Sequence, residues 1–494
     1  MARARRTCAC WGIDTSEERM SDESFAFPRA VLSPAPAAPG ARTVTPHPAP
    51  LTRADLRAPF APPADGVERI GLEVESGVVD PGTGLAAPYE GAGGMAAILR
   101  TVLAEWGGEP QFDTGRMTGV HLPDGVRITL EHGGQLEYSS VPVDGLARAV
   151  AEARARLEQL AGLVDRFGLA LLPGALLPFD RVEAMAWVPM VRGAVMREHF
   201  ARVGPPASGA RRVMALSLST QVHLDFLDER DFTEKLRMLM AASTPVAALF
   251  VNSPIIGGRA NGLLSNRSQD WLRMDPDRCG VMPPALRSGV GIGDVVDWAL
   301  DRPMVYRRHP DGDYRLAPER PFGALLREGF EDGSPPRYED WLAHLSQLWT
   351  AVRVRGTLEL RSADGPPYRH LAALPALWTG LGYHPESRTA AWELLRGFTA
   401  DQHRSAAAAL PAEGLRTMLG GERVLELAAE LVRLARAGLR ARVDAGREPP
   451  QVLDLLDPLD EVLHTRRTFA EQCADRWERD LRREPRRYVA EFRV

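Results

Sequence analysis

The stretch Thr357-Leu-Glu-Leu-Arg-Ser-Ala-Asp-Gly365 alternates polar and apolar side chains. Glu359 and Arg361 fall on one side of an extended chain, and Leu358 and Leu360 fall on the other, because successive strand residues point to opposite faces. The pattern predicts a strand with one polar and one apolar face. A carboxylate and a guanidinium two residues apart on the polar face suit the joint binding of a cation and an anion.

Three other segments, 70–75, 130–139 and 218–225, repeat this design. If these strands belong to one sheet, its polar face gathers several carboxylates, and like charges raise each other's pKa. Divalent cations with oxygen ligands relieve that crowding, and Mg²⁺ or Mn²⁺ bound to substrate phosphates fits best. The acidic positions on this face are Glu73 and Glu75, Glu131 or Glu137, and Glu359.

Arginines supply the positive charge that such a site needs beside its cations. We expect Arg361 and Arg267 in this role, with Arg353 and Arg355 as further candidates. A metal ion and arginines around a developing negative charge are how phosphoryl transfer is stabilised. The loop from Asn252 towards Arg267 is rich in glycine and serine and suits an anion-binding turn.

Each motif alone has a plainer interpretation. A single Glu-x-Glu strand is more often a solvated face, and Glu359-x-Arg361 could be an ordinary ion pair. Gln221-x-His223-x-Asp225 could hold a satisfied, partly buried histidine. Four such strands in one chain favour a site.

The overall composition is that of a globular protein, with 45% hydrophobic and 25% charged residues. The 494 residues include 59 arginines and one lysine, Lys235, which has no glycine beside it. A Walker A loop is therefore excluded, since it requires a lysine after its glycines. The net charge of −5 does not favour nucleic acid as a partner. No apolar run predicts a membrane span, and four scattered cysteines predict no disulfide framework. We expect a cytoplasmic monomer or homodimer.

Two regions differ in composition. Residues 1–64 are rich in proline and alanine, and we expect them to be disordered because they cannot bury enough apolar surface. Residues 65–494 predict a single α+β domain, since strands and helices do not alternate as a doubly wound parallel sheet requires. We expect helices at 146–167, at 231–243 with Pro245 as its limit, at 423–443 and beyond 453. We expect strands at 67–75, 126–131, 135–141, 213–226 and 352–361.

From about residue 67 to about residue 445 the chain resembles the plant-type glutamate–cysteine ligases, and more closely their actinobacterial branch, which serves ergothioneine synthesis. The blocks that carry the resemblance are, in order, GLEVE, TLEHGGQLEYSS, LSTQVHLDF, LFVNSP, GLLSNRSQDW, DRCGVMPPAL, HLSQLWTAVRVRGTLELRSADGPP and LPALWTGL.

The resemblance implies a glutamine-synthetase-like fold, in which a curved antiparallel sheet holds ATP, divalent metal and glutamate on a polar concave face. It also implies the reaction. ATP phosphorylates the γ-carboxylate of L-glutamate, and the amine of L-cysteine attacks the acyl phosphate to give γ-glutamylcysteine, ADP and phosphate.

The resemblance also implies roles for individual residues. Arg361, Arg267 and Glu359 would be catalytic. The substrate and nucleotide pocket would use Gln135, Asn252, Ser253, Arg267 and Arg361. The metal ligands would be Glu73, Glu75, Glu131, Glu137, Gln221 and Glu359.

Two positions depart from the plant pattern. His132 stands where the plant enzymes have a proline, and His223 stands where they have an asparagine. His223 is thus a candidate metal ligand or glutamate contact. Three alternatives stay open: a ligase of this family with another amine acceptor, a glycoside hydrolase using two of the carboxylates, and a non-catalytic homologue.

Overall fold

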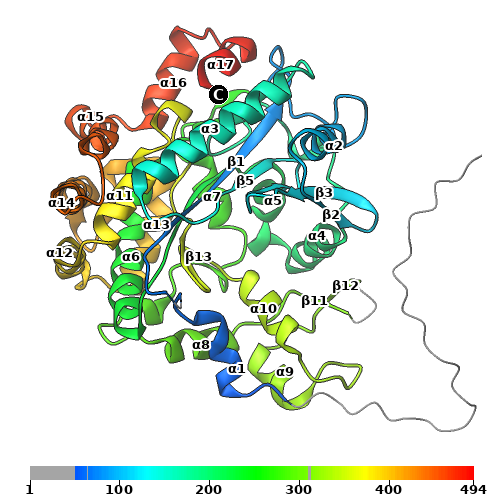
Figure 1. Ribbon diagram of the computed structural model, residues 1–494, viewed down its shortest axis with the longest axis vertical. Helices are drawn as coiled ribbons and strands as arrows, with labels where there is room; N and C mark the ends of the chain where they lie inside the picture. The colour runs from blue at the N-terminus through cyan, green and yellow to red at the C-terminus, as the bar shows by residue number, and fades with distance from the viewer. Residues whose placement is uncertain (1–49, 64, 310–312) are drawn as a thin grey trace, which may run out of the picture. The chain divides into compact units, whose positions relative to one another are not determined.

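A single antiparallel sheet runs through the centre of the structure (Figure 1). The structure is a computed structural model, and it describes residues 50–63, 65–309 and 313–494. Within these residues nine strands join in the order β14-β15-β7-β1-β5-β4-β3-β2, with β6 beside the second half of β1. Their bounds are β1 Ile70–Val79, β2 Glu109–Asp113, β3 Arg116–His121, β4 Arg127–Leu130, β5 Leu136–Ser139, β6 Ala170–Pro173, β7 Thr220–Leu224, β14 Val352–Val354 and β15 Leu358–Leu360.

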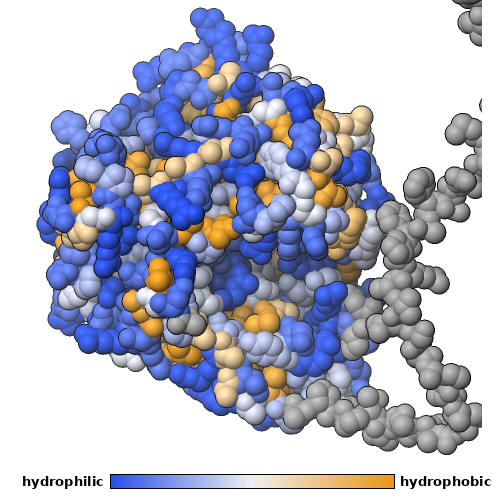
Figure 2. Space-filling model, viewed as in Figure 1, coloured by the Kyte–Doolittle hydropathy of each residue, from blue (hydrophilic) through white to orange (hydrophobic). Residues whose placement is uncertain are grey.

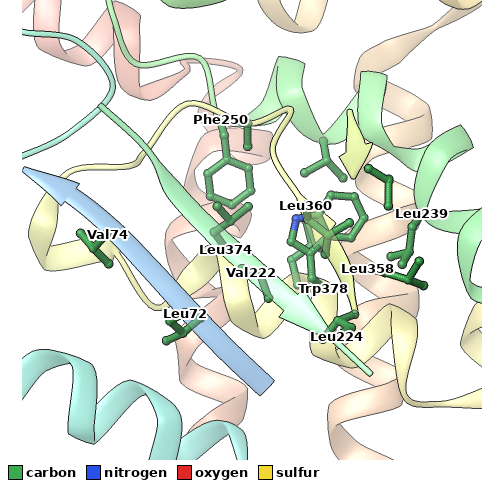
Figure 3. Packing of buried hydrophobic residues seen from close by; sticks show 14 of the residues in the cluster. Leu72, Val74, Val222, Leu224, Leu239, Phe250, Leu358, Leu360, Leu374 and Trp378 are labelled. Carbon is green, nitrogen blue, oxygen red and sulfur yellow. The ribbon is translucent and has the colours of Figure 1, made fainter. Parts of the chain in front are cut away.

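The apolar face of this sheet is buried against helices. Helices α6 (Glu229–Leu249) and α11 (Ala373–Gly382) pack on β7 and β15, and α12 (Pro385–Leu395) and α14 (Val424–Asp444) pack on those helices. Each fully buried aliphatic side chain contributes roughly 1.5–3 kcal/mol to folding. Figure 3 shows this packing for the strand residues Leu72, Val74, Val222, Leu224, Leu358 and Leu360 and the helix-side residues Leu239, Phe250, Leu374 and Trp378.

Because polar and apolar residues alternate along the central strands, the polar side chains lie on the face opposite the apolar one. Helix α3 (Leu146–Asp165) packs against β1 and β6, and α2 (Met95–Trp106) packs against β3. The other helices are α1 Arg53–Arg57, α4 Val191–Val203, α5 Ala210–Leu216, α7 Asn266–Trp271, α8 Ile292–Leu300, α9 Phe322–Glu328, α10 Tyr338–Ser346, α13 Ala400–Glu413, α15 Asp457–Thr465, α16 Phe469–Arg479 and α17 Pro485–Phe492.

In the part of the chain that the structure describes, four short two-stranded pairs complete the fold around the central sheet. Only one of them, β10 with β13, is parallel, and it lies beside the candidate site described below. The pairs are β8 Ile255–Ile256 with β9 Arg259–Ala260, β10 Cys279–Gly280 with β13 Trp349–Thr350, β11 Tyr306–Arg308 with β12 Tyr314–Leu316, and β16 Met418–Leu419 with β17 Glu422–Arg423.

Three expected element bounds are wrong. The expected single strand 352–361 is a hairpin of two antiparallel strands, β14 and β15, joined by a turn at 355–357. Helix α6 does not end before Pro245 but continues to Leu249. The second half of this helix is buried, so packing compensates for the one backbone hydrogen bond that proline removes. The expected strand 213–226 begins as helix α5 and becomes strand β7 only at Thr220.

The N-terminal boundary also needs correction. Residues 1–49 lie outside the described residues, but Arg53–Arg57 form α1 and Ala58–Phe60 a 3₁₀ turn, within the segment expected to be disordered. Leu56 and Phe60 are buried, and the Trp341 indole N–H donates to the Leu56 carbonyl at 3.0 Å. Apolar anchors at these two positions offset the ordering entropy that composition alone could not balance.

All described residues belong to one compact unit, and its being a single catalytic domain stays a prediction. Hydrophilic residues cover most of the face in Figure 2, with apolar residues in small groups between them. Among the described residues, no helix is both long enough and apolar enough to cross a membrane.

Candidate active site

The strand register brings acidic side chains of β1, β5 and β15 and the imidazole of β7 to neighbouring positions. Glu359 on β15 lies opposite His223 on β7, and Glu75 on β1 lies opposite Glu137 on β5. Glu73 lies opposite Ser139 on β5 and opposite Gln221 on β7. Because paired residues of adjacent strands share a face, these side chains form one polar patch, as the sequence pattern predicts.

One group in this patch consists of Glu73, His223 and Glu359, with ligand atoms all within 4.8 Å of one another. His223 Nε2 lies 3.4 Å from a Glu73 oxygen, and His223 Nδ1 lies 3.2 Å from the Thr357 hydroxyl. Burial acts to raise the pKa of Glu73, but the neighbouring His223 outweighs it and holds that pKa below its usual range. Burial also opposes a charged His223, yet Glu73 and Glu359 raise the pKa of the imidazole above its ordinary value.

Arginines neutralise the Glu359 carboxylate. Arg353, opposite Glu359 on β14, donates through Nε at 2.6 Å and Nη2 at 2.8 Å in a bidentate pair. Arg361 donates to the same carboxylate. Burial would raise the pKa of Glu359, but Arg353 and then Arg361 overcome it and hold that pKa far below its usual range. This group therefore carries its negative charge with compensation.

In the second group, Glu75, Glu131 and Glu137, compensation is incomplete, because Arg361 and Arg267 act to lower the pKa of Glu75 but do not outweigh its burial and its carboxylate neighbours. The oxygens of this group also lie within 4.8 Å of one another. Burial, and next the charge of Glu131, raise the pKa of Glu75 to about 7. Burial and the neighbouring carboxylates raise the pKa of Glu137 well above its ordinary value. Three carboxylates in this space need protons or a cation to coexist.

The donor sets of both groups fit divalent cations. Carboxylate oxygens, with one imidazole in the first group, are ligands that Mg²⁺ and Mn²⁺ accept. The crowding of the second group is the feature that a bound cation would relieve. Assignment of Glu73, Glu75, Glu131, Glu137 and Glu359 as metal ligands stays a prediction that this geometry supports.

Gln221 connects the two groups. Its amide nitrogen donates to Glu75 at 3.2 Å and to the Ser219 hydroxyl at 2.9 Å, and its amide oxygen accepts from Arg361. The side chain thus orients neighbouring charges through both of its ends. Its expected role as a metal ligand stays a prediction.

Three other candidate residues support the site from behind. The Gln135 side chain accepts from the Gly133 amide at 3.0 Å and donates to the Ser217 carbonyl at 3.1 Å. Asn252 donates through Nδ2 to the Gly365 carbonyl at 2.8 Å, and the Ser253 hydroxyl donates to Asp364. None of the three lines the cavity that lies beside the polar patch and is described below. Their contact with a nucleotide or substrate stays a prediction.

The double glycine after His132 allows a tight backbone turn. A side-chain carbon on Gly133 would lie 2.2 Å from the Ala215 carbonyl oxygen, so only glycine fits there. Gly134 adopts φ of +88°, a left-handed conformation that glycine tolerates at little cost. Together the two residues form the turn that presents Glu131 beside Glu137 and Glu75.

A cavity of about 1020 Å³ opens beside the polar patch. Arg361 and Arg267 belong to its wall, and the guanidinium carbons of both lie within 6 Å of the Trp271 ring centre, at 5.7 and 5.9 Å. Trp349 and Cys279, from the parallel β10–β13 pair, line the same wall. The cavity therefore combines cationic groups, these two arginines among them, with acidic and apolar residues.

Sequence reasoning placed most of the acidic residues and missed several of their partners. His223 was an open candidate, and the structure places it inside the first group. The strand pattern gave Arg353 only as a further candidate, although a hairpin through Gly356 would have set it opposite Glu359. Asp364 was not singled out, because a lone aspartate after a strand carries no recognisable signal.

Comparisons with known proteins agree with this geometry. Residues 69–491 match the family model described as glutamate-cysteine ligase family 2. The chloroplastic glutamate–cysteine ligase of Brassica juncea is 31% identical over 431 residues, which are 86% of this chain and 81% of that protein. The Arabidopsis thaliana enzyme is 32% identical over 433 residues, 86% of this chain and 80% of that protein.

A solved structure is similar in fold. The glutamate–cysteine ligase of Francisella tularensis, determined in complex with AMP, aligns with a TM-score of 0.54 and 12% identity over 86% of this chain and 87% of that one. The α+β fold expected from the sequence, with a polar-faced antiparallel sheet backed by helices, is thereby confirmed.

Proposed function

The chain belongs to glutamate–cysteine ligase family 2, and on this basis we propose that it joins the γ-carboxylate of L-glutamate to the amine of L-cysteine at the expense of ATP. The γ-phosphoryl group of ATP passes to the glutamate carboxylate, and ADP leaves. The cysteine nitrogen then bonds to the acyl carbon, phosphate departs and the amine loses a proton. The product is γ-glutamylcysteine.

The observation that carries this proposal is that Arg361 and the two clusters of metal-ligand candidates lie on one face of the sheet. Arg361 contacts Glu359 of the first group and, through Gln221, reaches Glu75 of the second. A reaction that moves a phosphoryl group between two anions needs positive charge placed in advance at the point of transfer. Arg361 and Arg267 supply fixed positive charge at the cavity wall.

Divalent cations complete this arrangement in the proposal. Glu73, His223 and Glu359 would hold one, and Glu75, Glu131 and Glu137 another, with Mg²⁺ or Mn²⁺ as the ion. Such ions neutralise phosphate oxygens and orient the transferred group. Arg353 keeps Glu359 ionised and fixed by its bidentate contact, so this ligand is ready before any ion arrives.

The cavity beside the patch suits the amino-acid substrates. Arg267 and Arg361 in its wall offer partners for carboxylate groups, since a guanidinium binds a carboxylate in a bidentate manner. Its apolar wall, which includes Trp349 and Cys279, suits a small uncharged side chain such as that of cysteine. A different amine acceptor for the same glutamate chemistry is the closest alternative.

The proposal extends to the setting of the enzyme. We place it in the cytoplasm, as a monomer or homodimer that binds small molecules and neither nucleic acid nor membrane. Cys279 and Cys473, the cysteines among the described residues, are both free, which supports a reducing compartment. We further place the product in the synthesis of glutathione or of ergothioneine.

ADP release by the purified protein, measured with glutamate and single amines as the acceptor, tests this function. We expect the fastest release with L-cysteine, little release without glutamate, and loss of activity when EDTA removes divalent ions. Addition of Mg²⁺ should restore it. Mass spectrometry of the reaction should detect γ-glutamylcysteine.

Each alternative predicts a different outcome of the same assay. Faster ADP release with another amine would show that this amine, and not cysteine, is the acceptor. Hydrolysis of glycosides without ATP and in the presence of EDTA would favour the hydrolase. Absence of ATP turnover with every pair, in protein that binds Mn²⁺ and ATP, would favour a non-catalytic homologue.

A further inference from the structure

Asp364 is a buried carboxylate to which nothing above gives a role. Its exposed fraction is 1%, and it does not line the cavity. Its Oδ2 accepts hydrogen bonds from the Asn252 amide at 2.9 Å and the Ser253 hydroxyl at 2.8 Å, and its Oδ1 accepts from the Ser265 hydroxyl at 3.0 Å. Three donors from two distant segments thus hold this carboxylate in one orientation.

Arg267 lies beside this carboxylate, with Nη1 at 3.7 Å from Asp364 Oδ1. The same guanidinium donates to the carbonyl oxygens of Ala363 at 3.1 Å and Arg361 at 3.2 Å, while its Nε has no hydrogen-bond partner among the described residues. Burial lowers the pKa of Arg267, and Asp364 is the strongest opposing charge. Asp364 therefore compensates a cation that is 3% exposed and lines the cavity.

The hydroxyl groups that bind Asp364 also fix the backbone of Arg267. The Ser253 hydroxyl accepts from the Arg267 amide at 3.2 Å, and the Ser265 hydroxyl caps helix α7 by accepting from the Ser268 amide at 3.0 Å. The first turn of α7 is thereby fastened to the loop after β15. That loop carries Arg361, so the relative position of the two arginines depends on one carboxylate.

We propose that Asp364 is a positioning residue, which sets the Arg267 guanidinium beside Arg361 in the cavity before substrate binds. The role rests on the proposed function, because the value of a preset cation lies in the anionic group that it receives. A guanidinium held in place loses less conformational freedom on binding than a mobile one. Loss of Asp364 should therefore weaken the binding of L-glutamate through Arg267.

A double-mutant cycle with Asp364→Asn and Arg267→Lys tests this role. Asparagine keeps the shape but offers one acceptor oxygen and no charge. We expect Asp364→Asn to raise KM for L-glutamate about 10- to 100-fold in the wild-type background, and less than about threefold further in the Arg267→Lys background. Calorimetric binding of L-glutamate to the Mg²⁺-loaded protein should show the same dependence without turnover.

Asp270→Asn is the matched control. Asp270 is 2% exposed, lies on the same helix α7 and pairs with Arg212, and among the described residues its side chain forms neither a hydrogen bond nor an ion pair with Arg267. Its replacement should lower thermal stability and leave KM for glutamate unchanged. If Asp364→Asn does not fold, Ser265→Ala serves instead, with Thr468→Ala, another buried helix cap, as its control. Ser265→Ala should raise KM several-fold and Thr468→Ala should not.

The role would be overturned if Asp364→Asn raised KM for L-glutamate by the same factor in the wild-type and Arg267→Lys backgrounds. It would also be overturned if the Asp364→Asn enzyme had the same KM as the Asp270→Asn enzyme. Either result leaves the proposed function standing, because the wild-type protein still ligates glutamate. A wild-type protein without ligase activity would instead refute the proposed function itself.

Discussion

Replacing Glu359 by glutamine should lower kcat/KM for ATP-dependent ligation at least about 30-fold, because losing a charge-stabilising group costs ~2–4 kcal/mol in the transition state. Glutamine removes one ligand charge from the first metal group and the counter-charge of Arg353 and Arg361. The residual positive charge of two partly buried arginines then disfavours a cation at His223 and Glu73. Initial rates of ADP release over a range of ATP and Mg²⁺ concentrations measure the effect.

Glu448→Gln provides the control for a buried, arginine-paired carboxylate outside the site. Glu448 accepts from the amides of Leu146 and Ala147 at the start of α3 and from Arg442 at 3.1 Å. Its loss should reduce the free energy of unfolding by ~1–3 kcal/mol and leave kcat/KM of the folded protein unchanged. A Glu359→Gln enzyme as active as the Glu448→Gln enzyme would remove Glu359 from the catalytic account.

Arg361→Lys should be nearly as damaging despite conserving the charge. The Arg361 guanidinium contacts Gln221 and Glu359 and also forms part of the cavity wall. A lysine ammonium is a point charge on a flexible stem and cannot reproduce this fork geometry. We expect the transition state to lose ~2–4 kcal/mol of stabilisation, as for loss of one transition-state donor, and kcat/KM to fall accordingly. The effect on kcat should exceed the effect on KM for ATP.

The matched control for this substitution is Arg388→Lys. Arg388 is buried and contacts Asp231, Glu234 and the Gly382 carbonyl, away from the polar patch. It should cost stability alone. An Arg361→Lys enzyme within a few-fold of wild type, measured beside Arg388→Lys, would show that charge without geometry is sufficient at position 361.

Much of the centre of the sheet could be predicted from the sequence because polar and apolar residues alternate along several of its strands. Leu72, Val74, Val222 and Leu224 point to the helices and leave their polar neighbours on the opposite face, so one pattern indicated both core and site. Helices α3 and α14 were likewise predictable from their apolar stripes. These elements follow from local periodicity alone.

Other features depend on tertiary contacts that no local pattern reveals. Pro245 lies inside α6 because the surrounding core stabilises that helix, and Phe60 orders a proline-rich segment by burial. The pairing of Arg353 with Glu359 depends on strand register. The convergence on Asp364 joins residues about 100 positions apart, with separations of 99 to 112.

The two carboxylate groups also differ in a way that the sequence did not indicate. Arginines balance Glu359, whereas Glu75 and Glu137 have raised pKa values because burial and neighbouring carboxylates act without an adequate counter-charge. Cation binding at the second group should therefore displace protons and weaken as the pH falls below about 7.

Equilibrium binding of Mn²⁺, followed by the loss of its free electron paramagnetic resonance signal, tests most directly whether these acidic side chains form cation sites. We predict two ions for each wild-type chain, and one each for Glu137→Gln and for Glu359→Gln, with the Glu448→Gln control retaining two. Undiminished Mn²⁺ binding by both site variants, or no Mn²⁺ binding by the wild-type protein, would contradict the account.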